Sequence, residues 1–180
     1  MVKPVREGST IGVTIARDVD ALASGIVLAR RYDSRVMVQR FVAGTEITVG
    51  VLATPDLCVL PTLEITYENE TYDYDAKYTE GRSHHIIPAR IPEPARRAAA
   101  DAAARVFRAA GCEGMARIDF IVDRDCVPWL LEVNTVPGLT ALSLLPDAAR
   151  AAGVSFPDLC ERLVRHGVDR QRRRVGPTAG

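Results

Sequence analysis

Hydrophobic residues recur along this chain with two different periods, which together predict a mixture of helices and strands. Helical spacing begins near Asp18, after which Leu22, Ile26 and Ala29 would share one face. Either Asp18 or Asp20 could cap the start of this helix, because both carry a short carboxylate. Runs rich in β-branched and other apolar residues predict strands, and these begin or lie at Val2, 36–38, 47–52 and 57–65.

Two further helices are predicted in the second half of the chain. One follows Pro92-Glu93-Pro94, since proline is tolerated in the first helical turn, and it ends at Gly111. Its apolar face is expected to carry Ala99, Ala102, Val106 and Ala110. The last helix begins at a capping box, Ser155-Phe156-Pro157-Asp158, and carries Leu159 and Leu163 on its apolar face.

A β-hairpin is predicted where residues 116–122 and 128–133 flank a polar turn. Glu132 and Asn134 are two residues apart, so their side chains lie on one face, and Asp119 falls opposite Glu132. Two carboxylates and an amide suit Mg²⁺ that is bound together with substrate phosphates. The alternative is the polar outer face of an ordinary hairpin. Apolar residues alternate with these three and would face a core: Ile118, Phe120, Leu131 and Val133.

Other residues add weaker signals for phosphate chemistry. The loop Gly8-Ser9-Thr10-Ile11-Gly12 could wrap phosphate oxygens with backbone N–H groups, although it lacks the P-loop form. Lys3 and Lys77 are candidate phosphate-binding cations, and a surface position is the alternative for each. Arg117 and a backbone N–H near Gly138 could stabilise an oxyanion, although a turn glycine is the commoner explanation.

Composition excludes several classes of protein. The 180 residues contain 23 Lys plus Arg and 23 Asp plus Glu, so net charge would recruit neither nucleic acid nor a membrane. Hydrophobic residues make up 47% of the chain, but the apolar runs are too short to span a bilayer. The four cysteines show no C-x-x-C spacing, which favours buried free thiols in a reducing cytoplasm over zinc ligands or disulfides.

Taken together, the motifs resemble those of the D-alanine–D-alanine ligases, which have the ATP-grasp fold. The similarity extends in the family's order and spacing to about Val168. It rests on the stretches Lys3 to Gly12, Gly44 to Val49, Tyr72 to Tyr78, Ala116 to Asp119 and Leu131 to Thr140, with Ser143, Leu144 and Pro146 beyond.

The resemblance implies an α+β protein in which two α/β lobes with antiparallel sheets grip ATP. Residues 1–42 would form part of the small lobe and residues 43–168 the large lobe, with a closing loop at 66–90. Residues 169–180 would be a disordered basic tail. Family members carry an N-terminal domain and an early part of the small lobe before the Lys3 motif. Without them, the sheet containing Lys3 would keep an unpaired edge and exposed apolar surface.

Roles for individual residues follow from the resemblance alone. ATP would contact Lys3, Gln39, the backbone of Arg40 and Val42, Glu46 and Lys77. Two Mg²⁺ ions, or Mn²⁺, would be held by Asp119, Glu132 and Asn134. Catalysis would use Ser9, Lys77, Tyr78, Arg117 and Gly138, and the second substrate would bind Gly138, Ser143 and Leu144. Gln39 stands where the family usually has glutamate, so altered nucleotide affinity is expected.

The implied activity is the ATP-dependent joining of two D-alanines through an acyl phosphate, for peptidoglycan precursor synthesis and thus cell wall biogenesis and cell shape, in the cytoplasm. A tyrosine after Lys77 indicates the dipeptide-forming branch. Two alternatives stay open: a truncated ATP- and magnesium-binding remnant without catalysis, or a ligase of other substrates that needs a partner chain. The missing lobe would then be supplied elsewhere or lost. A homodimer is the assembly common in the family.

Overall fold

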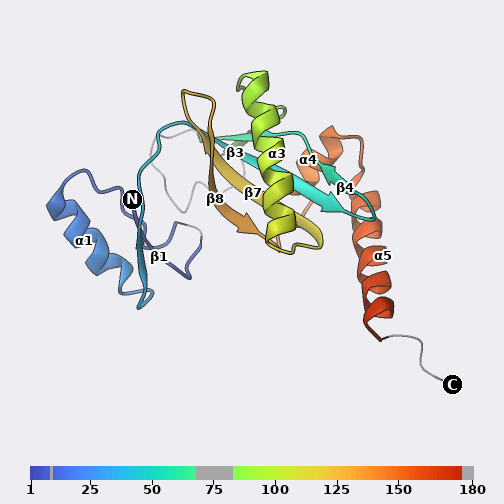
Figure 1. The fold of residues 1–180 in the computed structure, drawn as a ribbon, viewed down its shortest axis with the longest axis horizontal. Helices are drawn as coiled ribbons and strands as arrows, with labels where there is room; N and C mark the ends of the chain where they lie inside the picture. The colour runs from blue at the N-terminus through green and yellow to red at the C-terminus, as the bar shows by residue number, and fades with distance from the viewer. Residues whose placement is uncertain (9, 68–82, 176–180) are drawn as a thin grey trace. The chain divides into compact units, whose positions relative to one another are not determined.

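The computed structural model describes residues 1–8, 10–67 and 83–175 (Figure 1). The chain divides into two compact units, one formed by residues 1–42 and 66–84, the other by residues 43–65 and 85–180. Each unit is described by itself. Within the described ranges, no helix combines the length and the apolar character that a membrane crossing requires.

The first unit contains a two-stranded antiparallel sheet. Strand β1 (Val2–Pro4) pairs with β2 (Val36–Val38), and Lys3 lies opposite Met37. Val38 and Met37 are 57% and 40% exposed, so β2 presents apolar surface. Both strands lie where the hydrophobic pattern predicted them.

Helix α1 (Val19–Ala29) follows in the same unit and confirms the predicted helical spacing. The carboxylate of Asp18 accepts a hydrogen bond from the backbone N–H of Ala21 at 2.7 Å, which identifies Asp18 as the N-cap and places Asp20 in the first turn. Gly25 and Ala29 are the buried residues of this helix. Small side chains therefore line its inner face.

The larger sheet has the strand order β6-β5-β3-β7-β8, and β4 also pairs with β3. The prediction of one strand over 57–65 was wrong, because Pro61 lacks the N–H that a continuous ladder would need. Two strands replace it, and each pairs with a different end of β3. The bounds are β3 (Thr45–Ala53), β4 (Leu57–Val59), β5 (Leu63–Tyr67), β6 (Ser83–Ile86), β7 (Gly114–Val122) and β8 (Pro128–Asn134).

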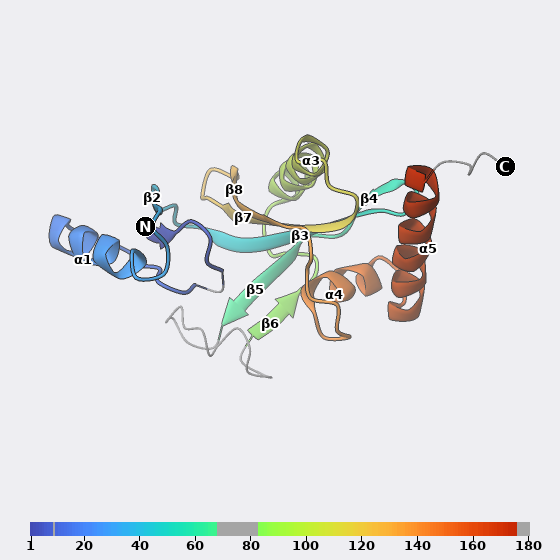
Figure 2. The same ribbon diagram turned by 90° about the horizontal axis from the view of Figure 1, so that it is seen from below.

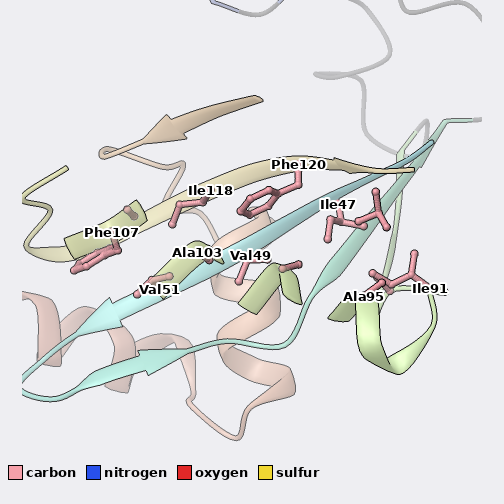
Figure 3. Close-up of a cluster of buried hydrophobic side chains, with 13 residues drawn as sticks. Ile47, Val49, Val51, Ile91, Ala95, Ala103, Phe107, Ile118 and Phe120 are labelled. Carbon is pink, nitrogen blue, oxygen red and sulfur yellow. The ribbon is translucent and has the colours of Figure 1, made fainter. Parts of the chain in front are cut away.

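Helix α3 (Glu93–Ala109) packs against one face of this sheet and closes the main hydrophobic core (Figure 3). Its start at Pro92 and the left-handed Gly111 after its end agree with the prediction. The predicted apolar face is confirmed at Ala99 and, in part, at Ala102 and Val106, which pack against the core, but it was wrong at Ala110. The fully buried row is the i, i+4 series that ends at Phe107. That row is Ala95, Ala99, Ala103 and Phe107, whereas Ala102 and Val106 are only partly buried and Ala110 is the exposed C-cap.

Helices α4 (Leu144–Ala151) and α5 (Phe156–Val175) form a second core, and Figure 2 shows α4 on the side of the sheet opposite α3. The predicted cap of α5 is present, since the Ser155 hydroxyl accepts a hydrogen bond from the backbone N–H of Asp158 at 3.2 Å and donates one to Asp158 Oδ2 at 2.7 Å. The second core contains Leu52, Leu60, Leu145, Ala148, Ala149 and Leu159, with Leu163 packed against it. Helix α5 continues to Val175, so residues 169–175 are helical and not part of an irregular tail.

The hairpin of β7 and β8 has the predicted pairing of Asp119 with Glu132, but its register shifts immediately afterwards. Because of this β-bulge, Phe120 pairs with Leu130, and Leu131 has no direct partner. Leu131 is half-buried and is not among the described residues that pack against the main core, whereas Val133 packs against that core as predicted. The four cysteines are free as expected, but none is buried: Cys58 is exposed, and Cys112, Cys126 and Cys160 are half-buried.

Candidate functional site

Three adjacent strands of the second unit carry a row of polar side chains on one face. The register places Thr48 of β3 opposite Asp119 of β7, and Asp119 opposite Glu132 of β8. Directly paired residues of antiparallel strands project to the same face. Alternation along β7 sends Ile118 and Phe120 to the other face, into the core beneath α3.

Asp119 is the centre of this row. Arg117 donates two hydrogen bonds to it, from Nε to Oδ1 at 3.0 Å and from Nη2 to Oδ2 at 2.9 Å. The hydroxyl of Thr48 donates a third, to Oδ1 at 2.6 Å. Glu132 lies further away, with its Oε1 3.9 Å from Arg117 Nη2. Asp119 is only 8% exposed, so the bidentate pair fixes its carboxylate inside the protein.

The electrostatics of the row favour a cation. Burial alone would lower the pKa of Arg117, but its hydrogen bonds to Asp119 and the charges of Glu132 and Glu46 raise that pKa above its ordinary value. The guanidinium is therefore a permanent positive charge. Three carboxylates, those of Asp119, Glu132 and Glu46, act on this one guanidinium, so the formal charge of the group is negative.

The donor set fits magnesium better than a softer metal. Asp119 and Glu132 offer carboxylate oxygens from paired positions, and Asn134 offers an amide oxygen two residues further on the same face. Within the described ranges, no cluster of three or more His, Cys, Asp or Glu side chains is arranged to hold a metal by itself. An ion here would need further ligands, and phosphate oxygens and water are the ligands that Mg²⁺ commonly keeps.

The segment after β8 leads to the beginning of α4. Asn134 Oδ1 accepts a hydrogen bond from the N–H of Val136, which opens a turn. Ser143 is the N-cap of α4, yet its side chain makes no cap hydrogen bond and instead contacts Thr140, at 3.1 Å from its N and 2.8 Å from its Oγ1. A Cβ on Gly138 would stand 2.9 Å from the Ser143 hydroxyl, so glycine permits this close approach.

The remaining predicted site residues lie elsewhere in the chain. Lys3 is in β1 of the first unit, which also contains Gln39, Arg40 and Val42. The backbone carbonyl of Gln39 accepts a hydrogen bond from the Met1 amino group at 2.9 Å. The structure therefore places Glu46, Arg117, Asp119, Glu132 and Asn134 in the second unit, while Lys3, Gln39, Arg40 and Val42 belong to the first. Ser9 and residues 68–82 of the expected closing loop, which include Lys77 and Tyr78, lie outside the described residues.

Two contacts were missed by the sequence analysis. Thr48 follows Glu46 by two residues in β3, so both lie on one face, but the predicted strand began only at Ile47 and did not include Glu46. The pairing of β3 with β7, which brings Thr48 to Asp119, carries no local sequence signal. Thr140 is the second, and its contact with Ser143 depends on a loop conformation.

The antiparallel sheet, its two covering layers and the row of oxygen donors define an ATP-grasp protein. Residues 1–165 match the family described as the D-ala D-ala ligase C-terminus, and the chain belongs to that family. The sequence is 49% identical over 164 residues to the D-alanine–D-alanine ligase of Pelotomaculum thermopropionicum, covering 91% of this chain and 52% of that relative. The chain thus spans about half the length of the curated relatives it matches.

Solved structures agree with this assignment. The Bacillus anthracis D-alanine–D-alanine ligase complexed with ATP superposes with a TM-score of 0.77 at 31% identity, over 97% of this chain and 55% of that one. The VanG D-Ala:D-Ser ligase of Enterococcus faecalis gives a TM-score of 0.78 at 32% identity, over 91% of this chain and 48% of that one. The prediction of family and fold made from the motifs is confirmed.

Proposed function

We propose that the protein containing this chain joins two D-alanines at the expense of ATP, in the cytoplasmic synthesis of peptidoglycan precursors. The observation that carries this proposal is the arrangement of Asp119, Arg117 and Glu132, because it combines fixed oxygen donors with a permanent cation on one face of the sheet. The family assignment supplies the reaction class.

The proposed reaction has two steps. A carboxylate oxygen of the first D-alanine attacks the γ-phosphorus of ATP, the bond to the β,γ-bridging oxygen breaks, and ADP leaves with its electron pair. The amine of the second D-alanine then attacks the acyl carbon, loses a proton, and expels phosphate as the peptide bond forms. Two bound Mg²⁺ ions would supply charge neutralisation to the phosphate oxygens.

Each site residue of this chain would have a separate role in the proposed reaction. Asp119, Glu132 and Asn134 would hold the metal ions against the phosphates, as their shared face allows. Arg117 stays charged at any working pH, so its guanidinium can donate hydrogen bonds to oxygens that gain negative charge in both steps. Gly138 would offer its N–H to the same intermediate.

The second D-alanine would bind where α4 begins. Helix N-termini present N–H groups to anions, and the Ser143 side chain leaves the first turn uncapped because it contacts Thr140. Ser143 and the N–H of Leu144 are therefore suited to a substrate carboxylate. D-alanine is proposed as the acceptor because the curated relatives that the chain matches at 43–49% identity are D-alanine–D-alanine ligases.

Isothermal calorimetry of ATP binding to the chain, with and without Mg²⁺, tests the metal assignment. We expect Mg²⁺-dependent binding that is lost in Glu132→Gln, which removes a charge while keeping the shape of the side chain. The matched control is Glu161→Gln on α5, because the side chains of Glu161 and Glu132 are both 58% exposed.

Two results would contradict parts of the proposal. ATP binding that is equal with and without Mg²⁺ would show that the metal assignment is wrong. The absence of D-alanine-dependent phosphate release, measured on the protein with all its parts, would reject the ligase activity while leaving nucleotide binding intact.

A further inference from the structure

Thr48 is the buried polar residue closest to the candidate metal ligands. It lies in β3, is 2% exposed, and is paired directly with Asp119 in the register of β3 and β7. The distance from its Oγ1 to Asp119 Oδ1 is 2.6 Å, which is a short O–H···O hydrogen bond. A hydroxyl in this position is stabilised only by the partner it contacts, since burial of an unpaired hydroxyl is unfavourable.

The hydrogen bonds to Asp119 restrict which oxygen can accept a further partner. An ionised carboxylate has about four lone-pair positions. Thr48 and Arg117 Nε both donate to Oδ1, while Arg117 Nη2 donates to Oδ2. Three positions are thereby filled, and the one that remains is on Oδ2. The carboxylate is held from two sides, by a neighbouring strand and by its own.

We infer that Thr48 is a positioning residue, whose hydroxyl holds Oδ1 of Asp119 so that Oδ2 is presented to a divalent cation as a single, oriented ligand. This inference rests on the proposed function, because it takes Asp119 to be a metal ligand. Groups that orient a metal ligand through a hydrogen bond change metal affinity by about 10- to 100-fold when they are removed. Thr48 contacts neither substrate nor metal in this role.

The chain provides a matched control. Thr62 is also a buried threonine, 4% exposed, but its hydroxyl has no hydrogen-bond partner among the described residues. Replacement of either threonine by valine removes one hydroxyl and keeps the volume almost unchanged. Only Thr48→Val removes a hydrogen bond to Asp119. The comparison of the two variants therefore separates orientation of the carboxylate from the general effect of a buried substitution.

Mn²⁺ binding, measured by electron paramagnetic resonance in the presence and absence of ATP, gives a readout that is independent of catalysis. We expect Thr48→Val to weaken Mn²⁺ binding by at least about 10-fold. Thr48→Ser, which restores the hydroxyl, and Thr62→Val should bind Mn²⁺ as the parent chain does. Urea unfolding of each variant shows whether it is folded, and Thr48→Ala replaces Thr48→Val if the valine variant does not fold.

The outcomes are distinct for the inference and for the function on which it rests. If the parent chain binds Mn²⁺ with ATP and a folded variant without the hydroxyl binds it equally well, Thr48 does not position Asp119. An equal loss in Thr48→Ser would also overturn the inference, because the hydroxyl would not be the active group. If the parent chain itself shows no ATP-dependent Mn²⁺ binding, the proposed metal site fails, and the role of Thr48 fails with it.

Discussion

The ion pair of His85 with Asp147 ties the end of β6 to the first turn of α4, and we predict that it contributes measurably to stability. His85 Nδ1 lies 2.5 Å from Asp147 Oδ2, and the two side chains are 20% and 11% exposed. Arg150 contacts the other oxygen of Asp147. Asp147 is therefore in contact with both His85 and Arg150, one at each carboxylate oxygen.

The expected magnitude follows from these contacts. A hydrogen bond to a charged group contributes about 1.5–3 kcal/mol, so a double-mutant cycle of His85→Ala and Asp147→Ala should give a coupling free energy in that range. His85→Ala alone should cost less than the roughly 3–5 kcal/mol of a buried charge without any partner, because Arg150 still contacts Asp147.

Urea denaturation followed by circular dichroism gives the unfolding free energy of each variant at one fixed pH. The control cycle uses Glu161 and Arg165, whose side chains are 58% and 76% exposed. Their coupling should stay below about 1 kcal/mol, since exposed ion pairs are weak. A coupling for His85 and Asp147 no larger than in the control cycle would refute the reasoning from burial.

Two further predictions concern the same sheet. Gly44→Ala should destabilise the fold more than Gly50→Ala, by about 1–3 kcal/mol in urea unfolding. A Cβ at position 44 would stand 2.1 Å from the backbone oxygen of Val122, whereas a Cβ at position 50 would meet the end of the Leu60 side chain at 2.8 Å. Equal losses of unfolding free energy in the two variants would contradict this prediction. Hydrogen bonds from Arg90 lower the pKa of Glu64, so the stability they confer is fully present above the ordinary carboxyl pKa of about 4.3 and is lost as the pH falls through the lowered value. The difference in unfolding free energy between the parent and Glu64→Gln should therefore shrink between about pH 5 and pH 2, and a constant difference would argue against it.

The secondary structure could be predicted where one local signal decided it. Period-two alternation placed β7 and β8, and the caps at Asp18 and Ser155 placed the starts of α1 and α5. The predicted face of α3 was only partly right, because alanines occupy many of its positions and apolar character alone does not distinguish the fully buried row. Packing of Phe107 against the sheet makes that distinction, and it is a tertiary effect.

The candidate site was likewise predictable only where local spacing places residues on one face of a strand. Spacing placed Asp119, Glu132 and Asn134 on one face, and the observed register agrees. The bulge after Asp119 was not predictable, because nothing in the sequence of β8 indicates which residue loses its partner. Thr48 was missed because it meets Asp119 across 71 residues of chain, a separation at which local patterns carry no information.

The alternation of β7 has a consequence for how this sequence can change. Its even and odd positions serve two purposes at once: Ile118 and Phe120 fill the core, while Arg117 and Asp119 form the polar row. A single inserted or deleted residue within β7 would exchange the two sets, placing charges in the core and apolar groups in the row. A substitution in β7 can therefore change one polar residue without disturbing the core, whereas an insertion or deletion in this strand would disrupt the core and the polar residues together. We therefore expect changes in length to be tolerated in the connections between strands and not within β7.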